Sequence, residues 1–590
     1  MASSILSHSP STTTAATAAA PHSSPFLLKP KHIPTSSKNP SRSYKISCKS
    51  SNHDHESPPP PSKFDRRNLL IGLGGLYGAT TLATSPFSFA APISGPDVTQ
   101  CGPADLPAGA TPTNCCPPLT GEILDFQFPP PPAKLRIRPA AHLADDAYIA
   151  KFNRAVELMR ALPDDDPRSF KQQANVHCAY CDGAYDQAGF PDLELQVHNS
   201  WLFFPFHRYY LYFYERILAK LIDDPSFAMP YWNWDAPAGM PIPRIYANPS
   251  SALYDPLRDK AHQPPALVDL NYSGTDPATT ANQQAQTNLT VMYRQMVSNS
   301  KTPRLFFGSP YRRGEDPNPG GGSIEGIPHG PVHVWTGDRT QPNTENMGNF
   351  YSAARDPIFY AHHSNIDRMW SVWKTLGGRR QDITDPDFLD AAFLFYDENA
   401  KMVRVKVRDC LDPRKLGYAY QDVEIPWANS RPTPRVSSVL RKLKKLGRAK
   451  AADAQSPREV FPAKLDRVLK VMVKRPKKKR SKKEKDELEE ILVIKGIEVD
   501  RDTYVKFDVY INDEDDEITT AENTEFAGSF VNVPHKHKHD KKIKTQLRLS
   551  ISDILEDLDA EDDEHVLVTL VPTNAGDAIT IHDIKIELDD

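Results

Sequence analysis

Six histidines have the residue type and the spacing that bound metal ions require. His329 and His333 stand at positions i and i+4, so on a helix both imidazoles lie on one face and can bind a single ion. His362 and His363 follow downstream. Neighbouring helical residues point about 100° apart, so we expect only one of this pair to face the same ion. A second group of three lies upstream and comprises His177, His198 and His207.

The chemistry of these ligands favours copper. Three imidazoles without a thiolate or a carboxylate suit zinc, copper or iron, and one such triad alone would also fit a zinc hydrolase. Two all-imidazole triads in one domain favour a pair of ions. Neutral nitrogen ligands suit copper that cycles between Cu(I) and Cu(II), and a facing pair can bind dioxygen. The other histidines are expected to be structural or solvated: His142, His262, His565 and His582.

The composition indicates what kind of chain must position these triads. A length of 590 residues predicts several domains. The 71 Lys and Arg nearly cancel the 75 Asp and Glu, which excludes a whole-chain polycation for nucleic acid. The mean hydropathy of −0.53 excludes a multi-span membrane protein. With 55 prolines and 28 glycines, the chain should be rich in loops.

The first ninety residues have the composition of targeting signals. Residues 1–53 contain no acidic residue and are rich in Ser and Thr, as in organelle transit peptides. Arg66-Arg67 then precede the apolar run 69–83, and a small-x-small site ends at Ala90, as in a twin-arginine export signal. The run is too short and too rich in Gly and Thr for stable membrane insertion. We therefore expect residues 1–90 to direct the chain into a chloroplast and on to the thylakoid lumen.

The remaining chain divides into three parts. Residues 91–430 contain helical stretches such as Asp145–Ala161 and Tyr209–Leu221 among long loops, of which 235–290 shows little periodicity. Residues 431–457 are basic and then small and polar, as in a protease-sensitive linker. Residues 458–590 alternate apolar and polar positions in short segments, which predicts an antiparallel β-sandwich. The predicted strands are Leu465–Val473, Glu490–Val499, Tyr504–Ile511, Lys544–Ile551, Val566–Val571 and Ala578–Ile586.

Two polar runs in the C-terminal part have a structural and a functional interpretation. Lys474–Lys485 could bind nucleic acid, but we favour a solvated hairpin loop whose charge is balanced by the acidic runs Asp513–Glu517 and Glu556–Glu564. We accordingly expect no nucleic-acid partner. His535, His537 and His539 alternate and could handle copper on one face of a strand. A polar hairpin tip is the favoured interpretation.

The cysteines indicate disulfides and one additional function. Cys48 leaves with the targeting signal, and an exported compartment permits disulfides in the rest. Five of the six remaining cysteines cluster within 81 residues, an odd number, so at least one of them has another role. Adjacent Cys115 and Cys116 make poor partners for each other. The six are Cys101, Cys115, Cys116, Cys178, Cys181 and Cys410.

Taken together, these motifs resemble the plant polyphenol oxidases (catechol oxidases), type-3 copper proteins of the tyrosinase family. The matching segments are HCAYC, the H-x8-H with its aromatic filler, GIPHGPVHVWTGD and DPIFYAHHSNIDRMW. The likeness continues through Gly417–Tyr420 and Ile425–Trp427 to VKFDVYIN and covers the whole chain. It implies a mainly α dicopper domain with a four-helix-bundle core and long loops, followed by the antiparallel β-sandwich.

The resemblance assigns the ligands of two copper ions. One ion would be held by His177, His198 and His207, and the other by His329, His333 and His363. It places His362 just outside the ligand shell.

It also assigns the cysteines. Cys181 would form a thioether bond with His198. Of the possible disulfide pairings, the family pattern favours Cys101–Cys116 and Cys115–Cys178. Cys410 would stay free and buried.

The resemblance further implies roles near the copper ions. Glu325 and Asn365 match the pair that holds a water able to take a phenolic proton, with a helix cap as the alternative role for each. Phe350 matches an aromatic gate over the second copper. Gly330 and Val334 match positions that bias substrate choice. Members that hydroxylate monophenols well often have Asn at the first position, so Gly330 favours diphenol oxidation.

The implied activity is the oxidation of ortho-diphenols to ortho-quinones, with dioxygen reduced to water. A tyrosinase that also hydroxylates monophenols and a dioxygen-binding protein like the hemocyanins are the alternatives. The partners implied are small phenolic substrates, the chain's own C-terminal domain as a shield of a latent form, and an activating protease that cuts the linker.

Overall fold

The computed structural model describes residues 91–118, 121–130, 132–435, 455–513, 520–536 and 542–589. The targeting signals, most of the linker, His537 and His539 lie outside these ranges. The described residues belong to one compact unit. Among them no helix is both long and apolar enough to cross a membrane.

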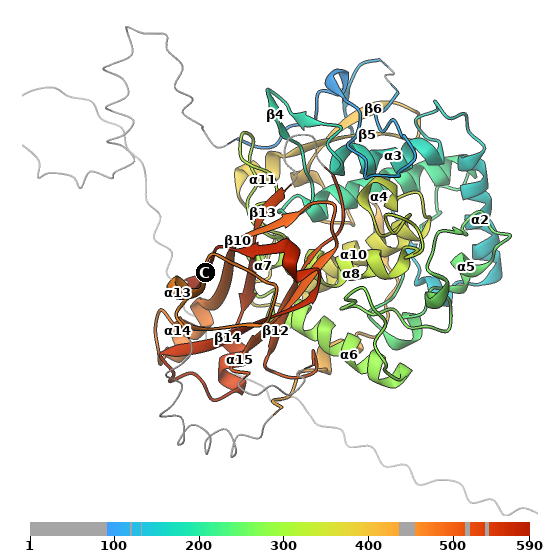
Figure 1. Ribbon diagram of the computed structural model, residues 1–590. Coiled ribbons are helices and arrows are strands. Elements are labelled where there is room, and N and C mark those ends of the chain that lie inside the picture. The colour runs from blue at the N-terminus through green and yellow to red at the C-terminus, as the bar shows by residue number, and fades with distance from the viewer. Residues whose placement is uncertain are drawn as a thin grey trace, which may run out of the picture. The chain divides into compact units, whose positions relative to one another are not determined.

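Helices occupy one half of this unit in Figure 1 and form the core around the histidines. Helix α4 packs against α10 and α2, and α3 packs against α2 and α9. The core helices are α2 (Asp146–Arg160), α3 (Phe170–Cys181), α4 (Phe203–Leu221), α8 (Gly330–Thr336) and α10 (Ile358–Thr375). The shorter ones are α5 (Arg244–Ala247), α6 (Ala281–Tyr293), α7 (Pro303–Phe307), α9 (Phe350–Ala353) and α11 (Pro386–Asp390).

The sequence predicts some of these bounds better than others. The expected helix 145–161 is confirmed as α2, because the Asp145 side chain caps its start by accepting the N–H of Tyr148. Helix α4 begins earlier than expected, at Phe203, because its aromatic first turns are buried on all sides and lack an amphipathic period. Helix α6 begins inside 235–290, where its polar sequence hides it and the Thr280–Gln283 capping box marks its start.

Small strands join the loops of the helical half. Strand β1 pairs with β6, β6 with β5, β2 with β7, and β3 with β4. Their bounds are β1 (Leu124–Asp125), β2 (Arg136–Arg138), β3 (Asp186–Gln187), β4 (Phe190–Glu194), β5 (Ala392–Tyr396), β6 (Met402–Lys406) and β7 (Tyr418–Tyr420).

The C-terminal half is the predicted antiparallel β-sandwich. One sheet has the order β13-β10-β15-β8 with β16 also on β10, and the other has the order β12-β11-β14-β9. Apolar side chains of both sheets form a second core. The strands are β8 (Ala463–Lys464), β9 (Leu469–Lys474), β10 (Glu489–Asp500), β11 (Val505–Ile511), β12 (Phe526–Asn532), β13 (Lys542–Ser550), β14 (His565–Asn574), β15 (Ile579–Ile581) and β16 (Asp583–Asp589). Three short helices accompany them: α13 (Pro457–Val460), α14 (Lys482–Glu487) and α15 (Ser552–Asp557).

The basic run 474–485 does not form the expected hairpin loop. It contains the start of α14 and connects β9 to β10, which belong to different sheets. The expected balance of charge is present in its contacts with 556–564. Lys478 Nζ lies 3.0 Å from Glu564, and Lys485 pairs with Glu561.

A buried network of charges fixes the helices that carry histidines. Arg208 follows His207 on α4, and its Nε lies 2.5 Å from Oδ1 of Asp367 on α10. Arg138 on β2 extends the network from Asp367 to Glu215, with Nε 2.9 Å from Glu215 Oε2. Because losing one partner of a buried ion pair costs roughly 3–5 kcal/mol, these pairs hold α4 and α10 in one register.

Candidate metal centre

The first histidine triad converges from two helices and a loop. His177 lies on α3, His207 on α4, and His198 in the loop before α4. Each is at most 2% exposed. The ring centroids lie 5.1 Å apart for His198 and His207, 5.3 Å for His177 and His198, and 5.8 Å for His177 and His207.

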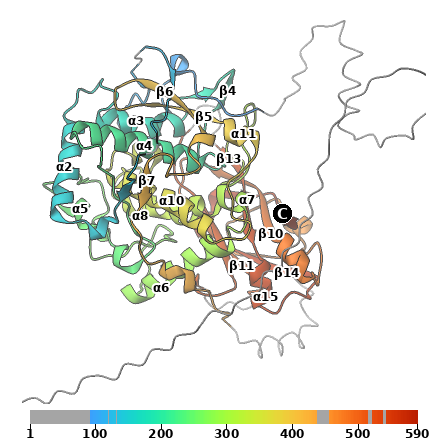
Figure 2. The same ribbon diagram turned by 180° about the vertical axis from the view of Figure 1, so that it is seen from behind.

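The second triad faces the first. His329 ends the π-helical turn Glu325–His329, His333 lies on α8, and His363 on α10. The His329 ring lies 4.6 Å from that of His333 and 5.0 Å from that of His363. The two triads meet where the rings of His207 and His363 stack at 4.2 Å. Figure 2 shows α8 beside α10 from behind.

The nitrogen atoms of these rings suit metal ions. In His177, His207 and His333 Nδ1 lies 2.8 Å from the carbonyl oxygens of Phe350, Phe203 and Met347, respectively. An N–H at Nδ1 that donates to such an oxygen leaves the lone pair on Nε2. Nδ1 of His198 lies near a glutamine oxygen and that of His329 near a carbonyl oxygen. Among the described residues, the buried Nε2 atoms of four rings have no hydrogen-bond partner: those of His177, His198, His207 and His329.

Burial also keeps these imidazoles neutral. It lowers the pKa of His177 to about 3 and that of His333 to about 4, against the partial effect of their carbonyl contacts. Burial likewise lowers the pKa of the other rings of both triads. Neutral, aprotic nitrogens are the form that binds a metal ion, so the described residues fit two ions with nitrogen ligands.

His362 and His363 differ in the state of their nitrogen atoms. Both lie in a group with His329 and His333 whose ligand atoms are all within 4.8 Å of one another. Trp234 donates its indole N–H to His362 Nδ1 at 3.2 Å, so a neutral His362 carries its proton on Nε2 and has no lone pair there for a metal ion. His363 Nε2 instead lies 3.3 Å from Nε2 of His333.

The cysteines are arranged around the first triad. Cys101 is bonded to Cys116 and Cys115 to Cys178, each pair with a Cα–Cα distance of 5.8 Å. The second bond ties the N-terminal loop to α3. Cys181 and Cys410 are buried free thiols. The sulfur of Cys181 lies within 4.8 Å of ring nitrogens of His177 and His198.

Glu325 is a buried carboxyl group at the edge of the second triad. Burial raises its pKa to about 8, although backbone N–H groups of Asn199 and Gly322 donate to it. Its backbone carbonyl lies 3.0 Å from Nδ1 of His329. A carboxyl group with this pKa can exchange a proton near neutral pH.

Asn365 is held by other side chains. Its amide donates to Asp235 at 2.9 Å and accepts from Arg368 at 3.1 Å. Asp235 also accepts the indole N–H of Trp427 at 2.9 Å. No hydrogen bond joins Asn365 to Glu325 among the residues that the structure describes, so any link between them requires a water.

Phe350 lies closest to the first triad, whereas we expected it over the second ion. Its ring stacks on His198 at 4.1 Å and meets His177 edge-on at 5.6 Å, while His333 lies 6.4 Å away. The carbonyl of Phe350 contacts the Nδ1 of His177, which fixes α9 against α3. The aromatic ring therefore covers the side of the cluster from which His177 and His198 come.

Residues 531–536 of the C-terminal half cover the centre, and we call them the covering segment. The His535 ring stacks on Phe350 at 5.1 Å, and the carbonyl of Pro534 accepts the N–H of Phe350 at 3.2 Å. A Cβ atom on Gly330 would meet Val531 Cγ1 at 2.9 Å and Val533 Cγ2 at 3.3 Å. The covering segment thus occupies the space that a side chain at position 330 would need.

A buried ion pair anchors the covering segment. Arg501 Nη1 lies 2.7 Å from Oε1 of Glu194 on β4, and both side chains are at most 5% exposed. The carbonyl of Arg501 accepts the N–H of His535 at 3.0 Å and the side-chain N–H of Asn532 at 3.2 Å. One arginine thus joins the helical half to the segment over the metal centre.

Sequence reasoning missed several of these residues. Trp234, Asp235 and the pair Glu194–Arg501 lie far from the histidine motifs in sequence, and no spacing rule links them to the triads. Strand β12, whose last two residues begin the covering segment, reads FAGSFVN. Its apolar residues do not alternate cleanly and it contains Gly528 with a positive φ of 150°, so the period-2 signal is weak. The alternating histidines from 535 onward were the available signal. Their interpretation as a polar tip is wrong for His535, whose side chain is buried and stacks on Phe350.

Three regions of the chain match known protein families. Residues 167–376 match the common central domain of tyrosinase, residues 382–433 the polyphenol oxidase middle domain, and residues 461–588 the chloroplastic polyphenol oxidase C-terminal domain. All six triad histidines lie in the first region. The tyrosinase family implies a dicopper centre, which the two histidine clusters fit.

Similar proteins agree over nearly the whole length. The chain is 63% identical to "Polyphenol oxidase, chloroplastic" of Malus domestica, covering 96% of each chain, and 64% identical to "Aureusidin synthase" of Antirrhinum majus, covering 94% of this chain and 100% of the other. The solved structure of latent apple tyrosinase matches with a TM-score of 0.75 and 63% identity, over 80% of this chain and all of the other. The fold and the site are those of a tyrosinase-family copper oxidoreductase. Within that family, the chain belongs to the plant polyphenol oxidases.

Proposed function

We propose that this protein oxidises ortho-diphenols to ortho-quinones at a dicopper centre, with dioxygen as co-substrate and water as its reduction product. His177, His198 and His207 would hold one ion, and the second would be held by His329, His333 and His363. The observation that carries the proposal is the pair of facing, buried triads whose imidazoles are neutral. When bound, the copper pair supplies the redox chemistry and the site for dioxygen.

The residues around the ions would position the phenol and move its proton. The pKa of Glu325 near 8 favours uptake of a phenolic proton close to neutral pH. Asn365 would orient a water toward it, because Asp235 and Arg368 fix the amide. The rings of Phe350 and the triad histidines form an apolar wall against which an aromatic ring can pack.

We propose diphenols as the preferred substrates because Gly330 offers no side chain that could assist a monophenol. Val334, one turn further along α8, would line the same side. The names of relatives differ on this point, since they include an aureusidin synthase and a tyrosinase. Assay of linker-cut protein on a monophenol and its matching diphenol, with copper content measured, tests the activity and the preference together. Equal rates on both would contradict the preference, and no copper-dependent oxidation of either would contradict the activity.

We further propose that the intact chain is latent. The covering segment occupies the surface above Phe350 and Gly330, where a substrate would arrive. The C-terminal domain would act as a shield, and a protease that cuts the linker 431–457 would release it. The targeting signals 1–90 favour the chloroplast and, within it, the thylakoid lumen as the place of this step. The comparison of activity before and after cleavage of the linker tests it directly.

A further inference from the structure

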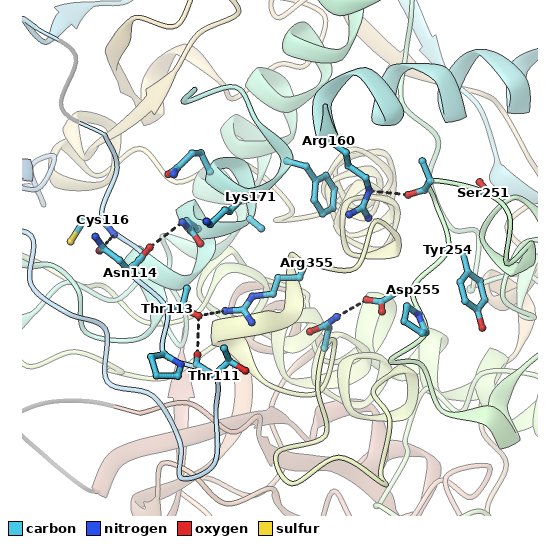
Figure 3. Close-up of a pocket in the computed structure, with 18 residues that line it drawn as sticks. Thr111, Thr113, Asn114, Cys116, Arg160, Lys171, Ser251, Tyr254, Asp255 and Arg355 are labelled. Atoms are coloured by element: carbon cyan, nitrogen blue, oxygen red, sulfur yellow. Dashed lines mark hydrogen bonds between the residues drawn. The ribbon is translucent and has the colours of Figure 1, made fainter. Parts of the chain in front are cut away.

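A second cavity lies outside the histidine centre, on the other side of α3 and α9. Its volume is about 970 Å³. It lies between the end of α2, the first turns of α3, the disulfide-tethered loop 111–116 and the loop 251–256 (Figure 3). No triad histidine lines it. A volume of this size accommodates a whole small molecule.

Three cations surround this cavity. Arg160, Lys171 and Arg355 approach it from different elements in Figure 3. Lys171 pairs with Asp164 at 2.6 Å. Within the described ranges, neither arginine has a carboxylate at ion-pair distance. Arg355 donates only to the hydroxyl of Thr113, at 2.8 Å, and Arg160 to the carbonyl of Ala252, at 3.1 Å, while it stacks on Phe170.

Among the described residues that line the cavity, Asp255 has the only carboxyl group, and it does not balance these charges. Asp255 is buried and accepts hydrogen bonds from the Asn346 amide at 2.7 Å and the Leu257 N–H at 2.9 Å. Burial and the nearby Asp356 raise its pKa to about 6. The three cations outnumber Asp255 and the Asp164 partner of Lys171, so the cavity has a net positive charge. Arg355 is partly buried, and this burial lowers its pKa, although the nearby Tyr351, Glu345 and Asp182 act in the opposite direction.

The rest of the lining selects the kind of anion. Neutral hydrogen-bonding side chains surround the cations: Thr111, Thr113, Asn114, Gln172, Asn175 and Ser251. Guanidinium groups bind phosphate through paired N–H donors, and amides and hydroxyls match the hydroxyl groups of a sugar. We propose that this cavity binds a polyhydroxylated organic anion, of which a sugar phosphate is the simplest kind, with the phosphate between Arg355 and Arg160.

The position of the cavity couples it to the metal centre. Its wall includes side chains from the first turns of α3, the helix that carries His177, and Arg355, which follows the Phe350-containing helix α9. The His177 ring contacts the Phe350 carbonyl across these two helices. A ligand that bridges Arg355 and the first turns of α3 would hold both helices in place.

Calorimetric titration of the mature chain tests the proposal, with glucose 6-phosphate as the probe and glucose and inorganic phosphate as separate arms. We expect saturable binding of glucose 6-phosphate, weaker binding of inorganic phosphate and none of glucose. The titration is run with and without prior removal of copper by a chelator, and saturable binding should persist without copper, because no triad histidine lines the cavity.

Variants locate the binding. Arg355→Gln and Arg160→Gln should each weaken it by about tenfold, the loss expected for one charge-assisted contact. Arg244→Gln, which removes an exposed cation outside this cavity, should leave the affinity within about twofold. Arg160 is exposed, so its variant remains informative if Arg355→Gln fails to fold. Absence of saturable binding, equal affinity for inorganic phosphate, or unchanged affinity in both arginine variants would overturn the proposal.

Discussion

The rings of Phe350 and His535 stack 5.1 Å apart with their planes at 23°, and this contact joins the C-terminal domain to the metal centre. On its other side, Phe350 stacks on His198 at 4.1 Å. One aromatic ring is thus enclosed between a triad histidine and the covering segment. Anything that loosens this segment should uncover the ring and, in our proposal, admit the substrate.

The buried pair of Glu194 and Arg501 is the first place to loosen it. In Glu194→Gln, Arg501 loses the carboxylate at 2.7 Å while it stays docked, which costs about 3 kcal/mol or more. In the released domain, water solvates this arginine. We therefore expect diphenol oxidase activity of the uncut chain to rise by at least about tenfold. Cutting the linker of the Glu194→Gln variant should then raise its activity little further.

The matched control is Lys301→Gln. Lys301 also joins the two halves, with Nζ 2.5 Å from Asp553 and 3.4 Å from the buried Glu489. Lys301 and Asp553 are partly exposed, and Arg379 remains 3.5 Å from Glu489, so the loss of Lys301 should cost less than the loss of a fully buried partner. The uncut control should remain latent. If Glu194→Gln remains as latent as the control while the protein is folded, the ion pair does not hold the shield.

A side chain at Gly330 should have two separable effects. In Gly330→Asn the new Cβ meets Val531 Cγ1 at 2.9 Å, closer than van der Waals contact permits, so the covering segment must shift. We expect higher activity of the uncut chain on a diphenol. In the linker-cut form that contact is gone, and we expect only the ratio of monophenol to diphenol oxidation to rise. An unchanged uncut activity would show that the segment accommodates the side chain.

The adjacent histidines of α10 should differ in copper binding. His363→Ala removes a proposed ligand, and His362→Ala removes a ring whose Nδ1 accepts the N–H of Trp234. Copper analysis of both purified variants should give about one ion lost per chain for His363→Ala and little loss for His362→Ala. The reverse order would exchange the two assignments.

The grouping of the histidines could be predicted from sequence largely because helical spacing is local. His329 and His333 lie on consecutive turns, and the motif that contains His363 is continuous. The orientation of the rings was not predictable, since the carbonyls that contact Nδ1 of His177 and His333 belong to Phe350 at the start of α9 and to Met347 shortly before it. No local spacing rule links these two residues to the histidines. The contact of Phe350 with His198 was not predictable either, because the two residues lie far apart in sequence. The β-sandwich strands were largely visible from their alternation, whereas β12, with Gly528 inside it, was not.

For Cys181, near the first triad, we predict a covalent bond. We expect Cys181 to be bonded to a carbon of the His198 ring in copper-loaded protein, since its sulfur lies within 4.8 Å of the ring nitrogen. The bond replaces one hydrogen on each partner, a two-electron oxidation for which dioxygen at the proposed copper pair would be the oxidant. Mass spectrometry after reduction and digestion should therefore show the two peptides joined and about two hydrogens lighter. Recovery of Cys181 as a free thiol from copper-loaded protein would contradict the bond.

The pKa of Glu325 makes the stability of the copper-free protein depend on pH in a predictable direction. Burial raises this pKa from 4.5 to about 8. Protonated Glu325 contributes its full stability below pH 4.5, and this contribution is lost as the pH rises toward 8, because the unfolded chain ionises first. Glu325→Gln has no such loss. From pH 5 to pH 8 the free energy of unfolding of the wild type should therefore fall relative to that of this variant. Denaturant titration measures both free energies. Copper is left out because a bound cation would lower the pKa of Glu325. A difference between the two proteins that is constant from pH 5 to pH 8 would show that Glu325 is not held protonated by its burial.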